Sequence, residues 1–172
     1  MSDFPFTYVE TWSHSYGPSD PVNVLAKGIK LDDLVNFLVK ESNWHITDVA
    51  EDRYMPKKIG TLDFVKQDRQ LAYDGILNRV HLRLWNFPPE LPNGENYSLL
   101  GSVHQDATRL YGHRASDFEV AKHFLAETCS GNSKGWKVLT DGINLDNEVR
   151  EFEVPYHCGW ALLVDSTGGM GP

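Results

Sequence analysis

Residues 79 to 86 read R-V-H-L-R-L-W-N. In this stretch Val80, Leu82 and Leu84 alternate with arginine, histidine and tryptophan, which is the two-residue period of a β-strand with one apolar face. Residues 97 to 105, Y-S-L-L-G-S-V-H-Q, form a second extended pattern. The turn between the two patterns contains no segment that could form a helical crossover. We therefore expect the two strands to pair antiparallel.

Two amphipathic helices are expected as well. Over residues 31–42 the leucines and valine fall at helical spacing, with two aspartates in the first turn and Lys40 in the last, as the helix dipole favours. Further along, Ser116 and Glu119 fit a capping box, and the apolar stripe that follows stops near Gly131. Each helix thus has an apolar side that can pack on a sheet.

The order of these elements predicts the fold class. Other strands are expected at residues 21–27, at 136–140, where Asp141 and Gly142 would end the strand, and in two extended pieces of the tail. This gives the βαββαβ order of a ferredoxin-like α+β fold, with helices on one face of a mainly antiparallel sheet. The expected organisation is an irregular lead-in over 1–20, an α+β domain over 21–142, and a C-terminal β extension with a flexible tail over 143–172.

Composition and charge restrict the class of partner. The chain has 172 residues, 41% of them hydrophobic, and its 16 basic and 24 acidic residues give a net charge of −8. This charge argues against a nucleic-acid-binding protein, which needs a basic footprint, and against adhesion to anionic membranes. No apolar run approaches the ~20 residues of a membrane span. With two cysteines and no secretion signal, we expect a soluble cytoplasmic protein without direct membrane insertion.

The candidate site lies on the polar sides of the two paired strands. If the aliphatic residues of 79–86 pack under the helices, His81 and Arg83 point to the opposite face. On the partner strand, His104 and Asp106 share that face. Antiparallel pairing could bring all four side chains onto one surface.

The residue types in this region predict an anion site. Residues 79–114 contain four arginines, no lysine and three acidic residues, a small positive balance in an acidic chain. The planar fork of arginine suits two-point recognition of phosphate or carboxylate, and histidine exchanges protons near neutral pH. A small anion or a phosphoester is therefore the expected ligand, and hydrolysis of such an ester is one reaction that the site could perform. The proposed catalytic residues are His81, His113 and Asp106, with Asp106 orienting a histidine, and the proposed substrate-binding residues include Arg83, Arg114 and His104.

Three other readings of the same residues stay open. His81 and Asp106 can form a purely structural pair on a solvated sheet face. His104 and Asp106, completed by His81 or His113, have the donor types of a metal site, which we rank below an anion site because arginines repel cations. The chain can also be a non-catalytic interaction or self-association module that works through its aromatic N-terminal segment and C-terminal extension, since tryptophan and tyrosine are favoured at interfaces. The cofactor, if any, is left open.

The motifs together resemble those of the C-terminal domain of LssY-type proteins, from about Asp20 to Asp141. They are D-P-V-N (20–23), H-x-R-x-W (81–85), G-S-x-x-x-D (101–106), G-H-R (112–114) and T-D-G (140–142), in the family's order. In that family the domain often follows integral-membrane modules, and its function is uncertain. The sequence shows no such module, so we expect any lipid phosphate chemistry to act through a partner. As a second departure from the family, the tail after Asp141 is longer and differs from the usual short final strand. The resemblance implies that His81, Arg83, Trp85, Asp106, His113 and Asp141 occupy motif positions, and it adds Asp141 to the substrate-binding set.

Overall fold

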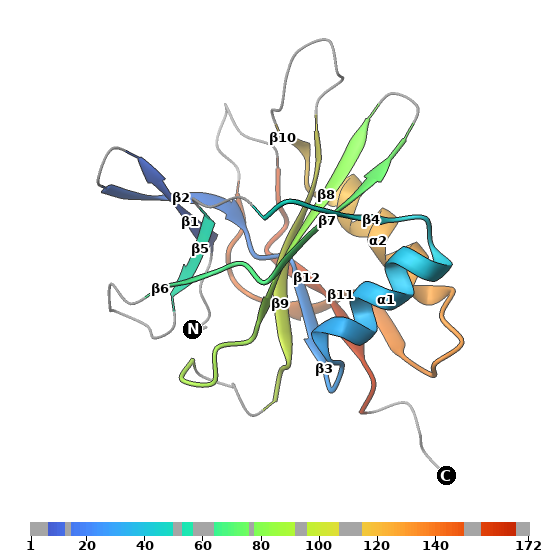
Figure 1. Cartoon of the computed structure of the whole chain (residues 1–172). Coiled ribbons are helices and arrows are strands. Elements are labelled where there is room, and N and C mark those ends of the chain that lie inside the picture. Colours follow the sequence, from blue (N-terminus) through green and yellow to red (C-terminus); the bar gives the residue numbers. More distant parts are fainter. Residues whose placement is uncertain are drawn as a thin grey trace.

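The computed structural model of the chain describes residues 7–12, 15–49, 53–56, 64–75, 78–91, 96–106, 115–149 and 156–167. These residues form two helices and a series of short strands (Figure 1). In chain order they are β1 (Thr7–Trp12), β2 (Ser15–Pro21), β3 (Val24–Lys27), α1 (Leu31–Glu41), β4 (His45–Thr47), β5 (Arg53–Pro56), β6 (Phe64–Lys66), β7 (Arg69–Asp74), β8 (Arg79–Asn86), β9 (Leu99–Asp106), β10 (Ala115–Asp117), α2 (Glu119–Ser130), β11 (Lys137–Asn144) and β12 (Trp160–Asp165).

The strands form two sheets. The larger, eight-stranded sheet runs β11-β12-β3-β9-β8-β7-β4, with β10 paired to β9, and a four-stranded sheet runs β2-β1-β5-β6. All pairs are antiparallel except β12 with β3. The expected α+β class and mainly antiparallel sheet are therefore confirmed. The ferredoxin-like order is wrong, because β7 and β4 extend the sheet beyond β8, and β12 lies between β3 and β11.

Strands β8 and β9 pair antiparallel at the centre of the large sheet, as the alternation predicts. His81 lies opposite His104, and Arg83 lies opposite Ser102. The close approach of the strands requires Gly101, because a Cβ at this position would lie 2.5 Å from the carbonyl oxygen of Arg83. The register therefore fixes which polar side chains become neighbours.

The two helices have nearly the expected bounds, but the start of α2 differs. The capping box is wrong: the helix begins at Glu119, and Ser116 still belongs to β10. The carboxylate of Asp117 instead accepts from the backbone N–H of Val120 at 2.8 Å. Glu119 is thus released from a capping role and turns toward other partners.

The expected end of a strand at Asp141 and Gly142 is also wrong. Strand β11 continues to Asn144, and its register against β12 shifts between Leu139 and Ile143. The irregularity absorbs both residues without ending the pairing, and a Cβ on Gly142 would lie 2.5 Å from that of Leu163. A turn signal in the sequence here marks a distortion within a strand.

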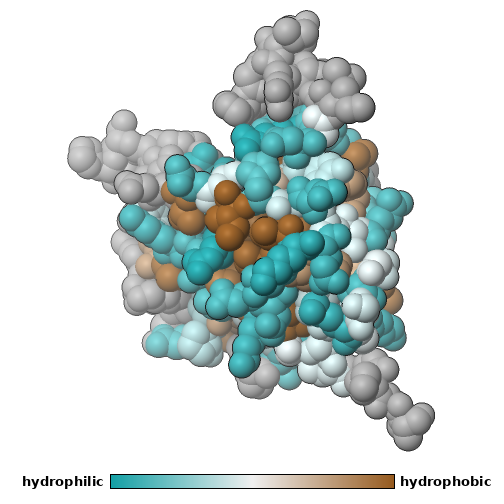
Figure 2. Space-filling view, turned by 45° about the vertical axis from the view of Figure 1, so that its right-hand side comes forward, coloured by the Kyte–Doolittle hydropathy of each residue, from teal (hydrophilic) through white to brown (hydrophobic). Residues whose placement is uncertain are grey.

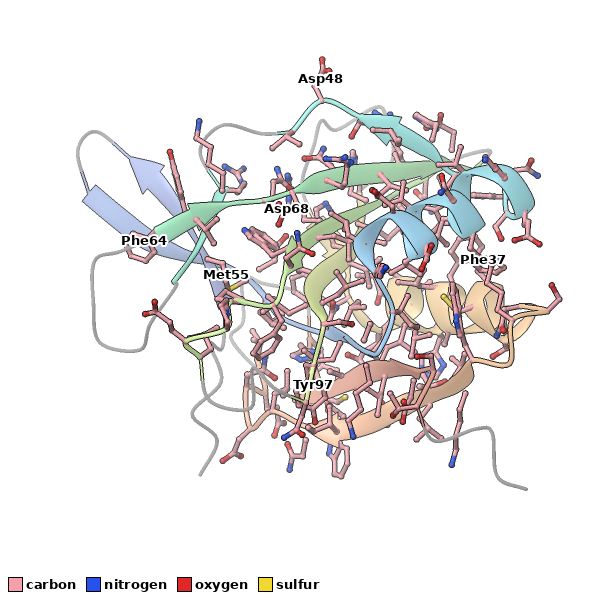
Figure 3. All side chains as sticks on the ribbon, turned by 60° about the horizontal axis from the view of Figure 1, so that its bottom comes forward. Phe37, Asp48, Met55, Phe64, Asp68 and Tyr97 are labelled. Atoms are coloured by element: carbon pink, nitrogen blue, oxygen red, sulfur yellow. The ribbon has the colours of Figure 1, made fainter. Side chains whose placement is uncertain are left out.

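Apolar side chains fill both sides of the large sheet. Helices α1 and α2 cover one side (Figure 1), where Val80, Leu82 and Leu84 join residues of both helices in the larger core. In Figure 3 side chains lie between the helices and the sheet, with Phe37 labelled on α1. The smaller core lies on the other side and includes Trp85 and, from the four-stranded sheet, Met55. The polar row of β8 thus lies on the side of the sheet away from the helices.

The C-terminal stretch 143–172 supplies part of the core. Strand β12 pairs with both β3 and β11, and its residues Ala161, Leu162 and Val164 are buried. The expected strand R-E-F-E-V lies outside the described residues. Neither described helix is long and apolar enough to cross a membrane. The face in Figure 2 is mostly hydrophilic, with one compact hydrophobic area near its centre.

Candidate functional site

The segment that precedes β3 is tied to β9 and thereby positions Asp20. The buried amide of Asn23 accepts from the N–H of Val103 at 2.8 Å and donates to the carbonyl of the same residue at 2.9 Å. The hydroxyl of Ser102 donates to the carbonyl oxygen of Pro21 at 2.8 Å. These bonds join residues some 80 positions apart in sequence. They bring the carboxylate of Asp20 beside the side chains of β9.

Four side chains from three segments form a continuous chain of contacts, which we call the carboxylate–imidazole relay. Asp20 Oδ2 lies 2.9 Å from His104 Nδ1, and His104 Nε2 lies 3.0 Å from Asp106 Oδ1. The other oxygen of Asp106, Oδ2, lies 2.7 Å from His81 Nε2. The ring centroids of His81 and His104 are 5.3 Å apart, as expected for residues directly opposite on paired strands. The relay therefore alternates acid and imidazole from Asp20 to His81.

The relay is largely enclosed. His81, His104 and Asp106 are 8%, 6% and 5% exposed. The alternative of a pair on a solvated sheet face therefore does not describe these residues, because contacts within the relay and from neighbouring segments shield them. Burial strengthens the electrostatic coupling between the charges, since little water screens them.

The electrostatics of the relay favour an imidazolium between two carboxylates. Burial lowers the pKa of His104, but hydrogen bonding and attraction to Asp106 and Asp20 outweigh burial and raise this pKa to about 9. Burial likewise raises the pKa of Asp106, yet the hydrogen bonds and charges of His104 and His81 hold it far below its usual range. At neutral pH His104 is therefore a cation and Asp106 an anion.

The second ring nitrogen of His81, Nδ1, is a candidate reaction point. Because ionised Asp106 can only accept a hydrogen bond, His81 Nε2 carries the hydrogen between them. His81 Nδ1 is buried and has no hydrogen-bond partner among the described residues. Buried polar atoms without partners are rare and point to a ligand, an ordered water or a functional role.

Arg83 stands two residues from His81 on the same face of β8. It is 9% exposed, and its guanidinium donates to the side-chain oxygen of Gln70 on β7. Gln67 donates to the same oxygen at 3.1 Å. This bonding holds a buried cation beside the relay, where it can attract an anionic ligand.

Two groups of side chains within the described part of the chain have the donor types and spacing of a metal site. In the relay, His81, His104 and Asp106 offer ligand atoms within 4.8 Å of one another. Two short His–Asp contacts already occupy these atoms, and each contact holds a hydrogen between its nitrogen and its oxygen, where a metal would have to lie. Proton-transfer chemistry therefore suits this group better than metal binding. Glu119, His157 and Cys158 form the second group.

The sequence-predicted site residues separate in the structure. His81, His104 and Asp106 come together, with Arg83 nearby. Asp141 does not join them, which corrects the expectation of a shared site: it lies on β11 and contacts the ammonium of Lys122 at 2.7 Å. His113 and Arg114 lie outside the described residues.

Sequence reasoning missed Asp20 as a member of the site. Its signal was its place at the head of D-P-V-N, but the motif was read as a match and given no chemical role. Reasoning from strand alternation could not find Asp20, because the residue comes from a different segment.

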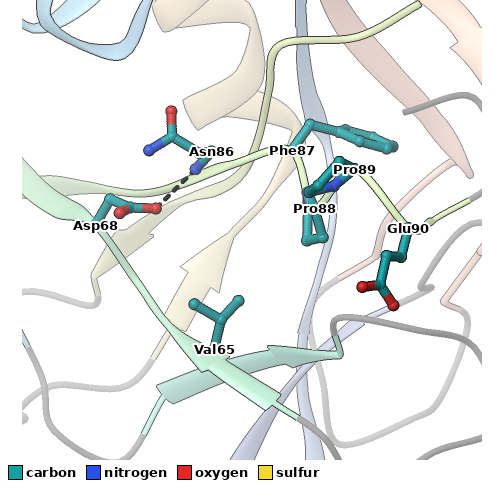
Figure 4. A pocket seen from close by; sticks show the side chains of 7 residues that line it. All are labelled: Val65, Asp68, Asn86, Phe87, Pro88, Pro89 and Glu90. Carbon is teal, nitrogen blue, oxygen red and sulfur yellow. Dashed lines mark hydrogen bonds between the residues drawn. The ribbon is translucent and has the colours of Figure 1, made fainter. Parts of the chain in front are cut away.

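A pocket lies at the other end of β8. It has a volume of about 330 Å³ and is lined by Val65, Asp68, Asn86, Phe87, Pro88, Pro89 and Glu90 (Figure 4). Asp68 accepts from the backbone N–H of Asn86 at 2.7 Å, which fixes one wall. The lining is mostly apolar and includes none of the relay residues, so we place the candidate chemistry at His81 and not in this pocket.

No known family model, no curated protein and no solved structure matches this chain.

Proposed function

We propose that the chain binds a small anionic ester, of the phosphate or phosphoester class, at His81 and hydrolyses it by general acid–base catalysis. The observation that carries the proposal is the state of the His81 ring: one nitrogen contacts Asp106 at 2.7 Å, and the other is buried without a partner among the described residues. A histidine oriented in this way by a carboxylate can exchange a proton with a bound ligand.

The relay would assign a separate task to each member. With its Nε2 hydrogen donated to Asp106, the His81 ring would use the lone pair of Nδ1 to take a proton from an attacking water. Ionised Asp106 would stabilise the resulting imidazolium, and that imidazolium would then protonate the leaving alcohol. His104 and Asp20 are positioning residues that hold Asp106 in place.

Arg83 would bind the anion. Its position on the same strand face as His81 places its charge near the proposed reaction point, and two-point recognition of phosphate is a property of the guanidinium group. Arg114 and His113, which lie outside the described residues, remain in the hypothesis as sequence-predicted members of the site. The proposed resemblance to LssY C-terminal domains supports one shared site, because three of its motifs supply Asp20, His81 with Arg83, and Asp106.

The test is hydrolysis of aryl phosphate monoesters and diesters by the purified chain, with and without divalent metal. His81→Gln keeps an amide near the position of Nε2 and removes Nδ1, so we expect a loss of roughly 100- to 10,000-fold in rate without unfolding. His123→Gln, at an exposed histidine on α2, is the matched control and should retain full activity.

Binding is measured separately from turnover. Inorganic phosphate should raise the melting temperature of the native chain, and Arg83→Lys, which keeps the charge but loses the fork, should weaken that protection. The proposal is wrong if His81→Gln hydrolyses the esters as fast as the native chain, or if neither turnover nor phosphate protection is found. Turnover that strictly requires an added metal would favour the metal alternative at the same residues.

Self-association is the second candidate function. It is favoured by exposed apolar side chains at the β11–β12 end of the large sheet: Leu139, Tyr156 and Trp160 are each at least 40% exposed. Light scattering of the native chain and of Trp160→Gln tests this role. A point substitution is needed because truncation at residue 143 would remove β12 from the core. A monomer at all concentrations would exclude assembly.

A further inference from the structure

A second cluster of charged side chains lies where α2 meets β11 and the start of β12. The side chain of Lys122 is fully buried, and its Nζ lies 2.9 Å from Glu119 Oε1, 2.7 Å from Asp141 Oδ1 and 3.0 Å from the carbonyl oxygen of Trp160. The same Nζ lies 3.2 Å from the sulfur of Cys158. The cluster is separate from the carboxylate–imidazole relay and has no part in the proposed hydrolysis.

The neighbouring side chains hold this arrangement in place. His157 Nδ1 lies 3.1 Å from Glu119 Oε2, and its Nε2 lies 3.0 Å from Asn147 Oδ1. Glu119 also accepts from the backbone N–H of Cys158 at 3.3 Å. The sulfur and the ammonium therefore cannot separate without disturbing several hydrogen bonds.

The side chains of Cys158 and Lys122 differ in their access to solvent. Cys158 is half-buried, and the carboxylate beside it, Asp141, is 53% exposed, whereas Lys122 is completely enclosed. A small solute can therefore reach the sulfur from outside. Because Lys122 is enclosed, its amine can react only with an atom that is already inside the cluster. The sulfur of Cys158, which oxidation would make electrophilic, lies 3.2 Å from it. Reactive cysteines are typically found next to lysine and partly exposed, as here.

We propose that Cys158 and Lys122 are an oxidative modification site, at which a peroxide converts the pair into a covalent sulfur–nitrogen cross-link. In the first step the thiol of Cys158 is oxidised by two electrons to a sulfenic acid, while hydrogen peroxide is reduced to water. In the second step a carboxylate of the cluster takes one proton from the Lys122 ammonium, and the lone pair freed on Nζ attacks the sulfur. The S–N bond forms and the S–O bond breaks.

The protons of the second step have acceptors within the cluster. The ammonium loses two: one leaves with the hydroxide as water, and the other passes to the carboxylate of Asp141 or Glu119, which lie within 3 Å of Nζ. The product has two hydrogens fewer than the reduced pair. Two equivalents of a thiol reductant restore Cys158 and Lys122 and form a disulfide. While the link persists, it fastens α2 to the segment that leads into β12.

Peptide mass spectrometry of the full native chain after hydrogen peroxide tests the proposal. We expect a linked peptide joining residues 122 and 158, two hydrogens lighter than the sum of its parts, which disappears on treatment with dithiothreitol. Cys129 is the internal control: it is 1% exposed, burial raises its pKa to about 12, and it should stay a free thiol. A sulfenic or higher acid at Cys158 with no linked peptide would overturn the proposal, and so would equal oxidation of both cysteines.

Two variants separate the link from general oxidation. Cys158→Ser should give no linked peptide at any peroxide concentration. Lys122→Arg keeps a buried cation, and in it the sulfenic acid should accumulate and react with dimedone instead of forming the link. If Lys122→Arg does not fold, the native chain and Cys158→Ser still decide the outcome, because the linked peptide must be present in one and absent from the other.

Discussion

Replacing Asp20 by asparagine should remove much of the pH dependence of stability above neutral pH. His104 lies between Asp20 and Asp106; burial lowers its pKa, but the two carboxylates raise it to about 9, against 6.5 for an ordinary histidine. A pKa that is higher in the folded state stabilises the fold fully below 6.5, and this contribution is lost as pH rises through 9. At about 1.4 kcal/mol for each pKa unit, His104 contributes roughly 3 kcal/mol.

Asp20 supplies one of the two carboxylates, so its removal should cost roughly half of this, on the order of 1 to 2 kcal/mol, below pH 6.5. Urea unfolding at a series of pH values measures the free energy of unfolding of both proteins. The difference in unfolding free energy between the native chain and Asp20→Asn should shrink by on the order of 1 to 2 kcal/mol between pH 6.5 and values above 9. The ring signals of His104 in NMR spectra should titrate at lower pH in the variant.

The matched control is Asp32→Asn. The side chain of Asp32 is 79% exposed, and its nearest cation, on Arg69, is 3.9 Å away. An exposed pair of this kind contributes little, so this variant should run parallel to the native chain across the same pH range. A gap between native chain and Asp20→Asn that stays constant with pH would refute the proposed ion-pair state of His104.

Two further predictions concern the scaffold of the site. Gly101→Ala should destabilise the chain by roughly 1–3 kcal/mol in urea unfolding, because its Cβ would meet the carbonyl oxygen of Arg83 at 2.5 Å. Gly131→Ala is the control and should change the unfolding free energy little, because the nearest atom to its Cβ is 3.5 Å away. Equal effects of the two substitutions would contradict the close packing of β8 on β9. Asn23→Ala should lower the free energy of unfolding by about 2 kcal/mol or more, because it leaves the N–H and C=O of Val103 buried without their amide partner. The stabilisation by phosphate should weaken as well, because the relay loosens. An unchanged melting temperature would show that these bonds do not hold the segment in place.

Much of the local structure follows from the sequence. The alternation in 79–86 predicts β8 with its observed bounds and assigns Val80 and His81 to opposite faces, as the two cores bear out. The apolar spacing predicts α1 to within a residue. These features depend on periods of two and 3.6 residues, which are visible in any short window. The Ser116–Glu119 pattern misled because β10 continues to Asp117, so α2 begins three residues after Ser116, and Asp117 contacts the first turn of the helix instead.

Other features depend on contacts between distant segments, which no local period records. The sequence by itself determined that His81, Arg83, His104 and Asp106 would stand on the polar faces of two strands, because the pleat fixes the direction of each side chain. Only the tertiary structure decided that β12 pairs beside β3, that Asn23 brings Asp20 to His104, and that Asp141 turns to Lys122 instead. The physical reason is that strand pairing, and the burial of charges next to opposite charges, are settled by the packing of the whole chain.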